Sequence, residues 1–355
     1  MNITKNKYIG SIMHFFFYYK DKKRIRPSED IVKNQLAKEK LEKIFNKRTE
    51  WKIPDRFIEN WGQVALYSPS GSIDNADSIL IDPEDGAYQL GNKLNELTGK
   101  EWVKFSCSWF IFNALREDLR AEKELDPKLE EHPATFSPTM ISEFIRFFTK
   151  GKSTVLDPFC GIGSTLEACK RTNRKGFGIE LNPKYYKLCL KRTPEFKDNI
   201  FNMDASEISK LNLPPIDFCI SSPPYWDILN RSTHTFRRGR REKSLDVNYS
   251  EKKADLGNIS NYEQFLTKLS GIYLEIYEKL VTNAYIVIIV KNVKKQGRMY
   301  TLAWDLAKIL SEKYVLKDEK IWIQDKVRLA PYGYPFSWAS TILHHYCLIL
   351  RKENE

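Results

Sequence analysis

Apolar and polar positions alternate along the second half of the chain in blocks that are typical of strands followed by helices. Apolar runs predict seven strands, at residues 153–157, 176–181, 200–205, 218–220, 284–290, 320–324 and 344–351. The run at 284–290, AYIVIIV, is nearly all apolar and β-branched, which is typical of a strand buried on both faces. Helical spacing predicts three amphipathic helices. One starts at Ser137 or Pro138, and the other two cover 262–280 and 299–310. Strands that alternate with helices predict an α/β fold, with helices on both faces of a mostly parallel sheet.

The first 130 residues follow a different pattern. Residues 1–50 are basic, and their apolar residues recur at near-helical spacing. Residues 51–130 are rich in aromatic side chains at irregular spacing, and 69–85 has the composition of a loop. We interpret 1–130 as a smaller, mostly helical and aromatic N-terminal region, and 131–355 as the main domain.

The most informative stretch is STVLDPFCGIGSTLEACKRTNRKGFGIEL at 153–181, which reads as strand, glycine-rich turn, helix and strand. Gly161 and Gly163 allow a tight turn whose backbone can approach a ligand. Ser164 can cap the helix that follows. Glu180 ends the second strand, and a carboxylate at this distance suits the two hydroxyls of a ribose.

A second informative stretch is IDFCISSPPYW at 216–226. An apolar strand runs into Ser222-Pro223-Pro224-Tyr225. The two prolines end the strand, remove two backbone donors and stiffen the turn. Tyr225 is then presented at the rim of the sheet.

The motif DPFCGIGST followed by SPPYW resembles the S-adenosylmethionine-dependent amino-methyltransferases of DNA, and its SPPY form resembles the cytosine-N4 branch. The resemblance spans about 132–351. It implies a Rossmann-like methyltransferase fold with a mostly parallel seven-stranded sheet, S-adenosylmethionine as the cofactor and no metal. We expect the cofactor to contact ten residues, which are Phe136, Asp157, Phe159, Gly161, Gly163, Ser164, Thr165, Glu180, Leu181 and Asp204. In the resembling family, an acid at the position of Asp204 meets the adenine amino group, although Asp204 could instead cap a helix.

The SPPY turn suits methylation of an exocyclic amine. Such an amine is a poor nucleophile because its lone pair is delocalised into the ring. Ser222 Oγ and the carbonyl of Pro223 can accept its two N–H groups, while Pro224 keeps the turn rigid. Tyr225 offers a flat face to a base that has been flipped out of the duplex.

A net charge of +11 and a pI near 9.1 favour a polyanionic partner. We expect this partner to be double-stranded DNA. A basic run lies within an insertion at 227–260, just after the SPPY turn, and fits a clamp on phosphates. Its cationic side chains are Arg231, Arg237, Arg238, Arg240, Arg241 and Lys243. The recognition of the target sequence is expected in this insertion or in 1–130.

Other functions remain open at this point. Adenine-N6 enzymes usually carry Asp or Asn where Ser222 stands, so serine favours cytosine. An RNA amino-methyltransferase on the same fold and a catalytically silent DNA-binding subunit are further alternatives. Cytosine-C5 methylation is disfavoured because the chain has no Pro-Cys dipeptide. A P-loop is excluded because no Gly-Lys-Ser/Thr closes the turn, and Leu166 breaks the dehydrogenase glycine fingerprint.

The six cysteines are scattered singly, which argues against a zinc site or a disulfide framework. Cys160 and Cys219 are expected to be small buried residues. The apolar run at 12–19 is too short to span a bilayer. The sequence therefore predicts a cytoplasmic protein without membrane contact. We expect it to serve a restriction system beside an endonuclease that acts on the same site without forming a stable complex.

Overall fold

The computed structural model describes residues 65–67, 79–82, 86–89, 91–112, 132, 135–227, 255–324, 329 and 334–353. The chain divides into two compact units. The first unit is Met1–Cys107 with Thr149–Gly151, and the second unit is Ser108–Phe148 with Lys152–Glu355.

The described part of the first unit contains an antiparallel sheet and one short helix. The sheet is formed by β1 (Ala65–Tyr67), β2 (Ile79–Asp82) and β3 (Gly86–Gln89). The helix α4 (Gly99–Phe105) begins after Thr98, which forms a capping box with Glu101. The prediction of a mostly helical region is wrong for these residues. Strand β2 is only four residues long, and the turn-forming residues on both sides of it gave its segment the composition of a loop.

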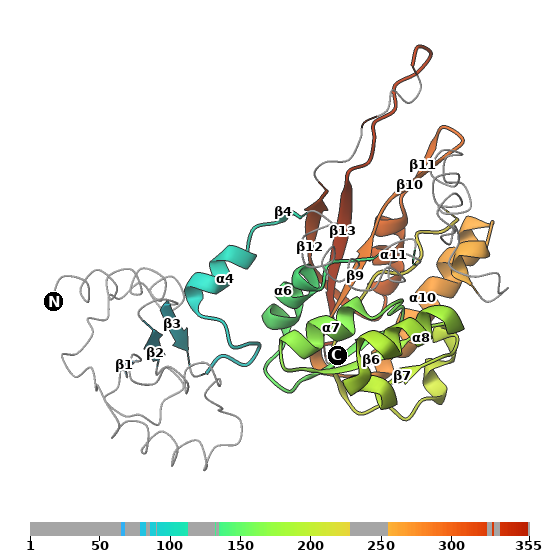
Figure 1. Ribbon diagram of the computed structural model, residues 1–355. Helices are drawn as coiled ribbons and strands as arrows, with labels where there is room; N and C mark the ends of the chain where they lie inside the picture. Colours follow the sequence, from blue (N-terminus) through green and yellow to red (C-terminus); the bar gives the residue numbers. More distant parts are fainter. Residues whose placement is uncertain are drawn as a thin grey trace. The chain divides into compact units, whose positions relative to one another are not determined.

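The second unit is built on an eight-stranded mixed sheet with the order β4-β12-β13-β9-β8-β5-β6-β7 (Figure 1). Five neighbouring pairs are parallel, and β13 is antiparallel to both of its neighbours. All seven predicted strands are present, so the predicted α/β fold is confirmed. They are β5 (Thr154–Asp157), β6 (Lys175–Ile179), β7 (Ile200–Phe201), β8 (Ile216–Ser221), β9 (Leu280–Val290), β12 (Val315–Ile323) and β13 (His344–Arg351).

The eighth strand, β4 (Trp109–Ile111), comes from a region that the sequence placed outside the main domain. It pairs in parallel with β12, and Trp109 lies opposite Ile321. The Trp322 indole Nε1 donates a 2.7 Å hydrogen bond to the carbonyl of Phe112, directly after this strand. The aromatic run at 109–112 therefore extends the main sheet at its edge.

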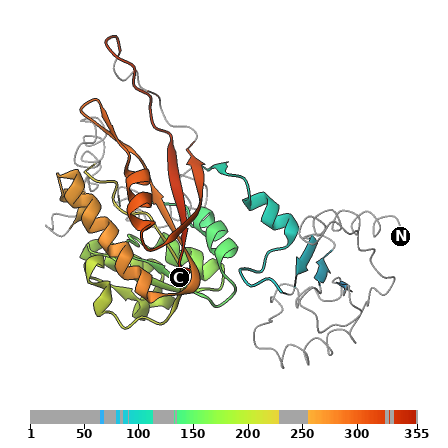
Figure 2. The same ribbon diagram turned by 180° about the vertical axis from the view of Figure 1, so that it is seen from behind.

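Helices cover both faces of this sheet, as predicted. Figures 1 and 2 show α6 (Pro138–Phe148) and α7 (Ser164–Arg171) on one face, and α10 (Tyr262–Lys279) and α11 (Leu302–Leu310) on the other. The predicted helix at 299–310 begins three residues late because Arg298–Tyr300 forms β11 of a hairpin with β10 (Val293–Lys295). Among the helices that the structure describes, none has both the length and the apolar character to cross a bilayer.

The strand order places the informative stretches of sequence at one edge of the sheet. β5 pairs in parallel with β6 on one side and with β8 on the other. The chain therefore leaves β5, β6, β7 and β8 at the same, carboxyl edge. The crossovers change direction at β5, and ligands of open α/β sheets bind at such a switch point. Cys160 and Cys219 lie buried near this edge, as predicted.

Candidate active site at the carboxyl edge of the sheet

The glycine-rich turn joins β5 to α7. Gly163 has φ 85° and occupies the N-cap position of α7, so the capping position predicted for Ser164 belongs to Gly163. A Cβ on Gly163 would lie 2.7 Å from the Sγ of Cys189. Both the left-handed backbone and this close approach require glycine. Ser164 is the first residue of α7. Cys189 belongs to the next helix, α8 (Pro183–Arg192).

The buried carboxyl group of Asp157 accepts hydrogen bonds from both ends of the turn. Its Oδ1 accepts a 2.9 Å hydrogen bond from the backbone N–H of Phe159, and the Thr165 hydroxyl donates to Oδ2. Burial raises the pKa of Asp157 to about 6, against the lowering effect of these two hydrogen bonds. The carboxyl group thus ties both ends of the turn to the strand.

Glu180 links the turn to the segment after β6. One carboxylate oxygen accepts a 2.9 Å hydrogen bond from the N–H of Gly161, and the other accepts a 2.7 Å bond from the N–H of Asn182. Burial raises the pKa of Glu180 to about 7. Each oxygen keeps a lone pair, and the side chain is only partly buried. A carboxylate held in this way beside a glycine turn fits the ribose of a nucleoside cofactor.

Asp204 follows β7 at the same edge. Its Oδ1 accepts from the N–H of Ser206, so it caps the 3₁₀ helix η4 (Ala205–Lys210). Its Oδ2 forms a 3.3 Å ion pair with Lys268 of α10. The capping alternative is confirmed, and the contact of Asp204 with an adenine amino group stays a prediction.

The two remaining predicted cofactor residues flank this edge. The carbonyl of Leu181 accepts a 3.2 Å hydrogen bond from Asn202 Nδ2, which fixes the backbone after Glu180. The ring of Phe136 lies 5.4 Å from that of Trp322, between centroids. In the lead-in before Phe136, His132 lies next to the turn, because a Cβ on Gly161 would be 3.0 Å from its Nε2.

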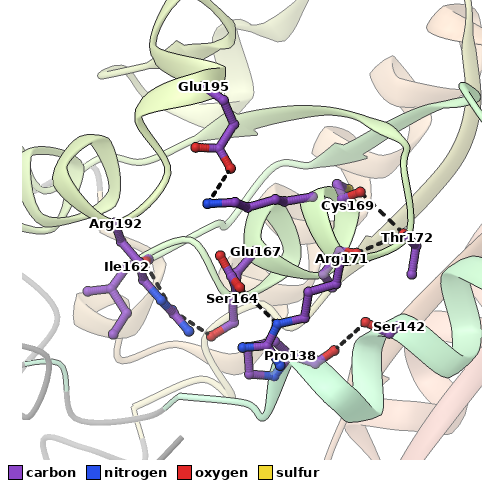
Figure 3. Close-up of polar contacts among 12 residues, drawn as sticks. Pro138, Ser142, Ile162, Ser164, Glu167, Cys169, Arg171, Thr172, Arg192 and Glu195 are labelled. Carbon is purple, nitrogen blue, oxygen red and sulfur yellow. Dashed lines mark hydrogen bonds and ion pairs between the residues drawn. The ribbon is translucent and has the colours of Figure 1, made fainter. Parts of the chain in front are cut away.

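Arg192, at the end of α8, forms hydrogen bonds with the glycine-rich turn. Arg192 Nη1 donates to the carbonyl of Ile162 at 3.2 Å and to the hydroxyl of Ser164 at 3.1 Å (Figure 3). Sequence patterns did not identify Arg192. It is the last residue of α8, no local motif marks it, and only the fold brings it to the turn.

The two serines at the end of β8 have different environments. Ser221 is buried, and its hydroxyl lies 2.8 Å from the hydroxyl of Tyr273 on α10. Ser222 is partly exposed, and its Oγ lies 2.9 Å from the hydroxyl of Tyr225. Ser221 therefore belongs to the core, whereas Ser222 and Tyr225 are available at the edge of the sheet.

The residue after the turn has an unusual backbone. Trp226 has φ 57°, which is strained for a bulky side chain, and it is buried. Lys295 of β10 lies 4.1 Å from the centre of its ring and 2.9 Å from a carboxylate oxygen of Asp227. Strain of this kind is often found at functional sites.

Aromatic rings from the last two strands lie close to Tyr225. The His345 ring is 5.6 Å from that of Tyr225 and stacks on Trp322 at 4.4 Å, between centroids. Burial, with a smaller contribution from the charge of Lys291, lowers the pKa of His345 to about 3. His345 is therefore neutral at physiological pH and lies beside Tyr225 as an uncharged ring.

The structure brings the predicted cofactor and catalytic residues to one edge of the sheet. Pairing of Leu156 with Cys219 places the ends of β5 and β8 side by side, so the glycine-rich turn and the SPPY turn are neighbours. The six basic residues predicted to bind DNA, from Arg231 to Lys243, lie outside the described residues.

Comparison with known proteins gives the family. The sequence profile of the N6 and N4 DNA methylases, described as DNA methylase, matches residues 1–191, which is more than half of the chain. The chain belongs to the DNA methylase family. The match includes the glycine-rich turn and Glu180 and ends before the SPPY turn. S-adenosylmethionine is the cofactor that goes with this family, and the turn and the Glu180 carboxylate fit it.

Two curated relatives of this chain are type II methyltransferases from Bacillus subtilis. M.BglI is 30% identical over 120 residues, which cover 33% of this chain and 31% of M.BglI. M.BglII is 26% identical over 164 residues, which cover 45% of this chain and 40% of M.BglII. The chain therefore matches less than half the length of either relative.

Solved structures resemble this chain more distantly. TrmN from Thermus thermophilus is 14% identical, with a TM-score of 0.39, over 61% of this chain and 48% of TrmN. The N-methyltransferase NodS from Bradyrhizobium japonicum, in complex with S-adenosyl-L-homocysteine, is 11% identical, with a TM-score of 0.33, over 58% of this chain and 80% of NodS.

Proposed function

We propose that this methylase transfers a methyl group from S-adenosylmethionine to the exocyclic N4 of a cytosine in double-stranded DNA. One observation carries the proposal. A partly exposed Ser222-Pro223-Pro224-Tyr225 turn ends β8 next to the glycine-rich turn of the adjacent strand β5. Methyl transfer needs the site that binds the target amine to lie next to the site that binds the cofactor.

The cofactor supplies an electrophilic methyl group on a positively charged sulfonium. For the residues that hold it, we propose the glycine-rich turn from Asp157 to Thr165, with Glu180 accepting from the ribose hydroxyls. Phe136, Leu181 and Asp204 are proposed to line the same site. Arg192 acts only through the turn, because its contacts are to Ile162 and Ser164.

The catalytic part of the proposal concerns two acceptors at the SPPY turn. Ser222 Oγ and the Pro223 carbonyl accept the two N–H groups of the target amine and orient its nitrogen toward the methyl group. Tyr225 can donate its hydroxyl hydrogen to Ser222 Oγ, or accept one from it, and either arrangement leaves a lone pair on Ser222 for the base. Pro224 keeps the turn rigid.

The base reaches the turn only if it leaves the duplex. A base inside a helix cannot bring its amine to a strand end that is flanked by protein loops, so flipping is part of the proposal. The ring of Tyr225 lies 5.6 Å from the neutral His345 ring, between centroids, and in this proposal it offers its face to the flipped base.

We propose cytosine rather than adenine as the target base because of the identity of one residue. Serine stands at position 222, where the resembling adenine-N6 enzymes usually carry a carboxylate or an amide. Adenine-N6 methylation on the same site is the second candidate, and the family itself includes both N6 and N4 methylases. The names of the type II relatives support a place in a restriction-modification pair.

The test is a transfer assay with the purified chain. Plasmid DNA is incubated with labelled S-adenosylmethionine and digested, and the nucleosides are separated. We expect the label in N4-methylcytosine, and none with Ser222→Ala. Label in N6-methyladenine would replace the proposal by the second candidate. No label in any nucleoside would favour a catalytically silent subunit.

A further inference from the structure

Three large aromatic side chains are exposed in the segment that leads into β13. Tyr334 is 81% exposed, Phe336 is 94% exposed and Trp338 is 88% exposed. Single exposed apolar residues are common on protein surfaces, but three within five residues form a patch of the kind that marks an interaction site. We call Tyr334–Trp338 the aromatic segment. None of the roles proposed above uses it.

The aromatic segment is held against a neighbouring hairpin. Lys294 of β10 donates hydrogen bonds to the carbonyl of Ser340 at 2.7 Å and to its hydroxyl at 3.0 Å. The same ammonium lies 5.9 Å from the centre of the Trp338 ring. In both views of the second unit, the chain before β13 extends past the end of the sheet beside β10 and β11 (Figures 1 and 2). The exposed rings are therefore presented from an anchored loop.

That hairpin is in turn attached to the SPPY turn. Lys295, next to Lys294, contacts Asp227 and the ring of Trp226, the first two residues after Tyr225. Strand register agrees, because Val290 at the end of β9 pairs with Tyr346 and Ile288 pairs with Ser221. The aromatic segment, the hairpin and the catalytic turn thus leave the sheet at one edge.

The charged residues around the aromatic segment indicate what kind of partner it binds. The stretch KNVKKQGRMY at 291–300 has four cationic side chains and no acid, and Arg298 at its tip is exposed. Residues 334–343 carry no charge at all. Flat rings beside cations suit the bases and phosphates of a nucleic acid. Continuity with the SPPY turn favours the same DNA that presents the target base over a membrane or a protein partner.

We propose that the aromatic segment stacks on the bases that flank the flipped nucleotide, while the hairpin at 293–300 lies along the adjacent phosphates. This inference rests on the proposed function, because it needs a base to be flipped at the SPPY turn. Stacking on bases tolerates any sequence, since every base has a flat face. The aromatic segment therefore stabilises the opened duplex rather than reading the recognition site.

The test compares Phe336→Ala and Trp338→Ala with wild type in methyl transfer and in binding to a duplex that contains the methylated site. Each variant should lose about tenfold or more in DNA affinity, since one stacked base contributes about that much. The salt dependence of binding and the affinity for S-adenosylmethionine should not change. Trp338→Phe, which keeps a ring, should recover most of the loss. The control is Leu316→Ala, because Leu316 is 44% exposed at the opposite end of β12.

A second comparison ties the loss to base flipping. A mismatch at the target base lowers the energy needed to extrude it, so on saturating DNA the methylation rate of the alanine variants should fall less on a mismatched duplex than on a paired one. Wild-type methylation with unchanged DNA affinity in both variants would overturn the inference and leave the proposed function standing. An equal loss in Leu316→Ala would also overturn it. A wild-type chain that methylates no DNA would remove the proposed function and this inference together.

Discussion

The hydroxyl of Tyr225 lies 2.9 Å from the Oγ of Ser222, across the two prolines of the turn that ends β8. The preceding residue, Ser221, instead turns inward and pairs with Tyr273 in the core. One step along the strand thus separates a structural hydroxyl from one that faces the proposed substrate, in keeping with the alternation of side chains along a strand. The pair provides its own control for the catalytic proposal.

Ser222→Ala and Ser221→Ala should have opposite effects. Loss of the Ser222 acceptor should lower kcat about a hundredfold with little change in thermal stability, since a preorganised polar group at a reacting centre contributes on that scale. Loss of the Ser221 hydroxyl leaves the buried Tyr273 hydroxyl without that partner and should cost about 1–3 kcal/mol of stability. Activity at low temperature should survive in Ser221→Ala. Steady-state kinetics and thermal melting measure both, and reversed effects would contradict the assignment.

Cofactor affinity should depend on pH through Glu180. Its pKa of about 7 means that a large share of the folded protein carries the proton near neutrality. Ribose hydroxyls donate to the carboxylate form, so affinity should rise about fourfold between roughly pH 6.5 and 8.5 as Glu180 ionises. Calorimetry should show this rise in wild type and a flat profile in Glu180→Gln. A rise that persists in the variant would remove Glu180 from the cofactor site.

The same raised pKa affects stability in the absence of cofactor. Between the ordinary carboxyl value of 4.5 and about 7, the folded state holds a proton on Glu180 that the unfolded state has released. The folded state therefore binds more protons in this window, and stability should fall as the pH rises through it. Melting temperatures of wild type and Glu180→Gln, measured from about pH 5 to 8, should converge at the acidic end.

Gly163 and Gly271 should respond oppositely to alanine. Gly163→Ala places a Cβ against Cys189 in a left-handed backbone and should destabilise the protein by about 2 kcal/mol or more. Adding Cys189→Ala should recover the steric part only. Gly271 lies inside α10, and a Cβ added there would meet nothing within 4 Å, so Gly271→Ala should stabilise by about 0.5–1 kcal/mol. Chemical denaturation measures all three variants, and a neutral Gly163→Ala would contradict the geometry of the turn.

The basic run at 231–243 is expected to bind phosphates. Replacing Arg237, Arg238, Arg240 and Arg241 by alanine should weaken binding to cognate and scrambled duplexes alike. Each lost phosphate contact lowers the salt slope by about one unit, because fewer counterions are released. Loss restricted to the cognate duplex would instead indicate readout of base edges. An unchanged slope on both duplexes would show that the run is a solvated surface.

Local patterns were sufficient to predict the main sheet and the edge at which the two candidate turns lie. A continuous β-branched run identified β9, and glycine and proline turns marked the ends of β5 and β8. These signals come from residues adjacent in sequence, so periodicity and turn chemistry carry them. The strand ends of a parallel sheet then bring the turns together.

Long-range contacts could not be predicted in this way. The pairing of β4 with β12 joins residues more than 200 positions apart, and the three residues Trp109–Ile111 gave no period that suggested a strand. Arg192, Tyr273 and His345 reach the site from different elements, and no local motif marks them. The structure also shows that Ser221 is buried and Ser222 is partly exposed, a difference that the sequence SSPPY does not reveal.

The proposed reaction can be tested in cells by a map of modified bases in the genomic DNA of a host that expresses this chain and lacks other amino-methyltransferases. We expect N4-methylcytosine at one position of a fixed sequence context, and its absence from cells that express Ser222→Ala. N6-methyladenine at a fixed context, or unmodified DNA from cells with the folded wild-type chain, would contradict the proposal.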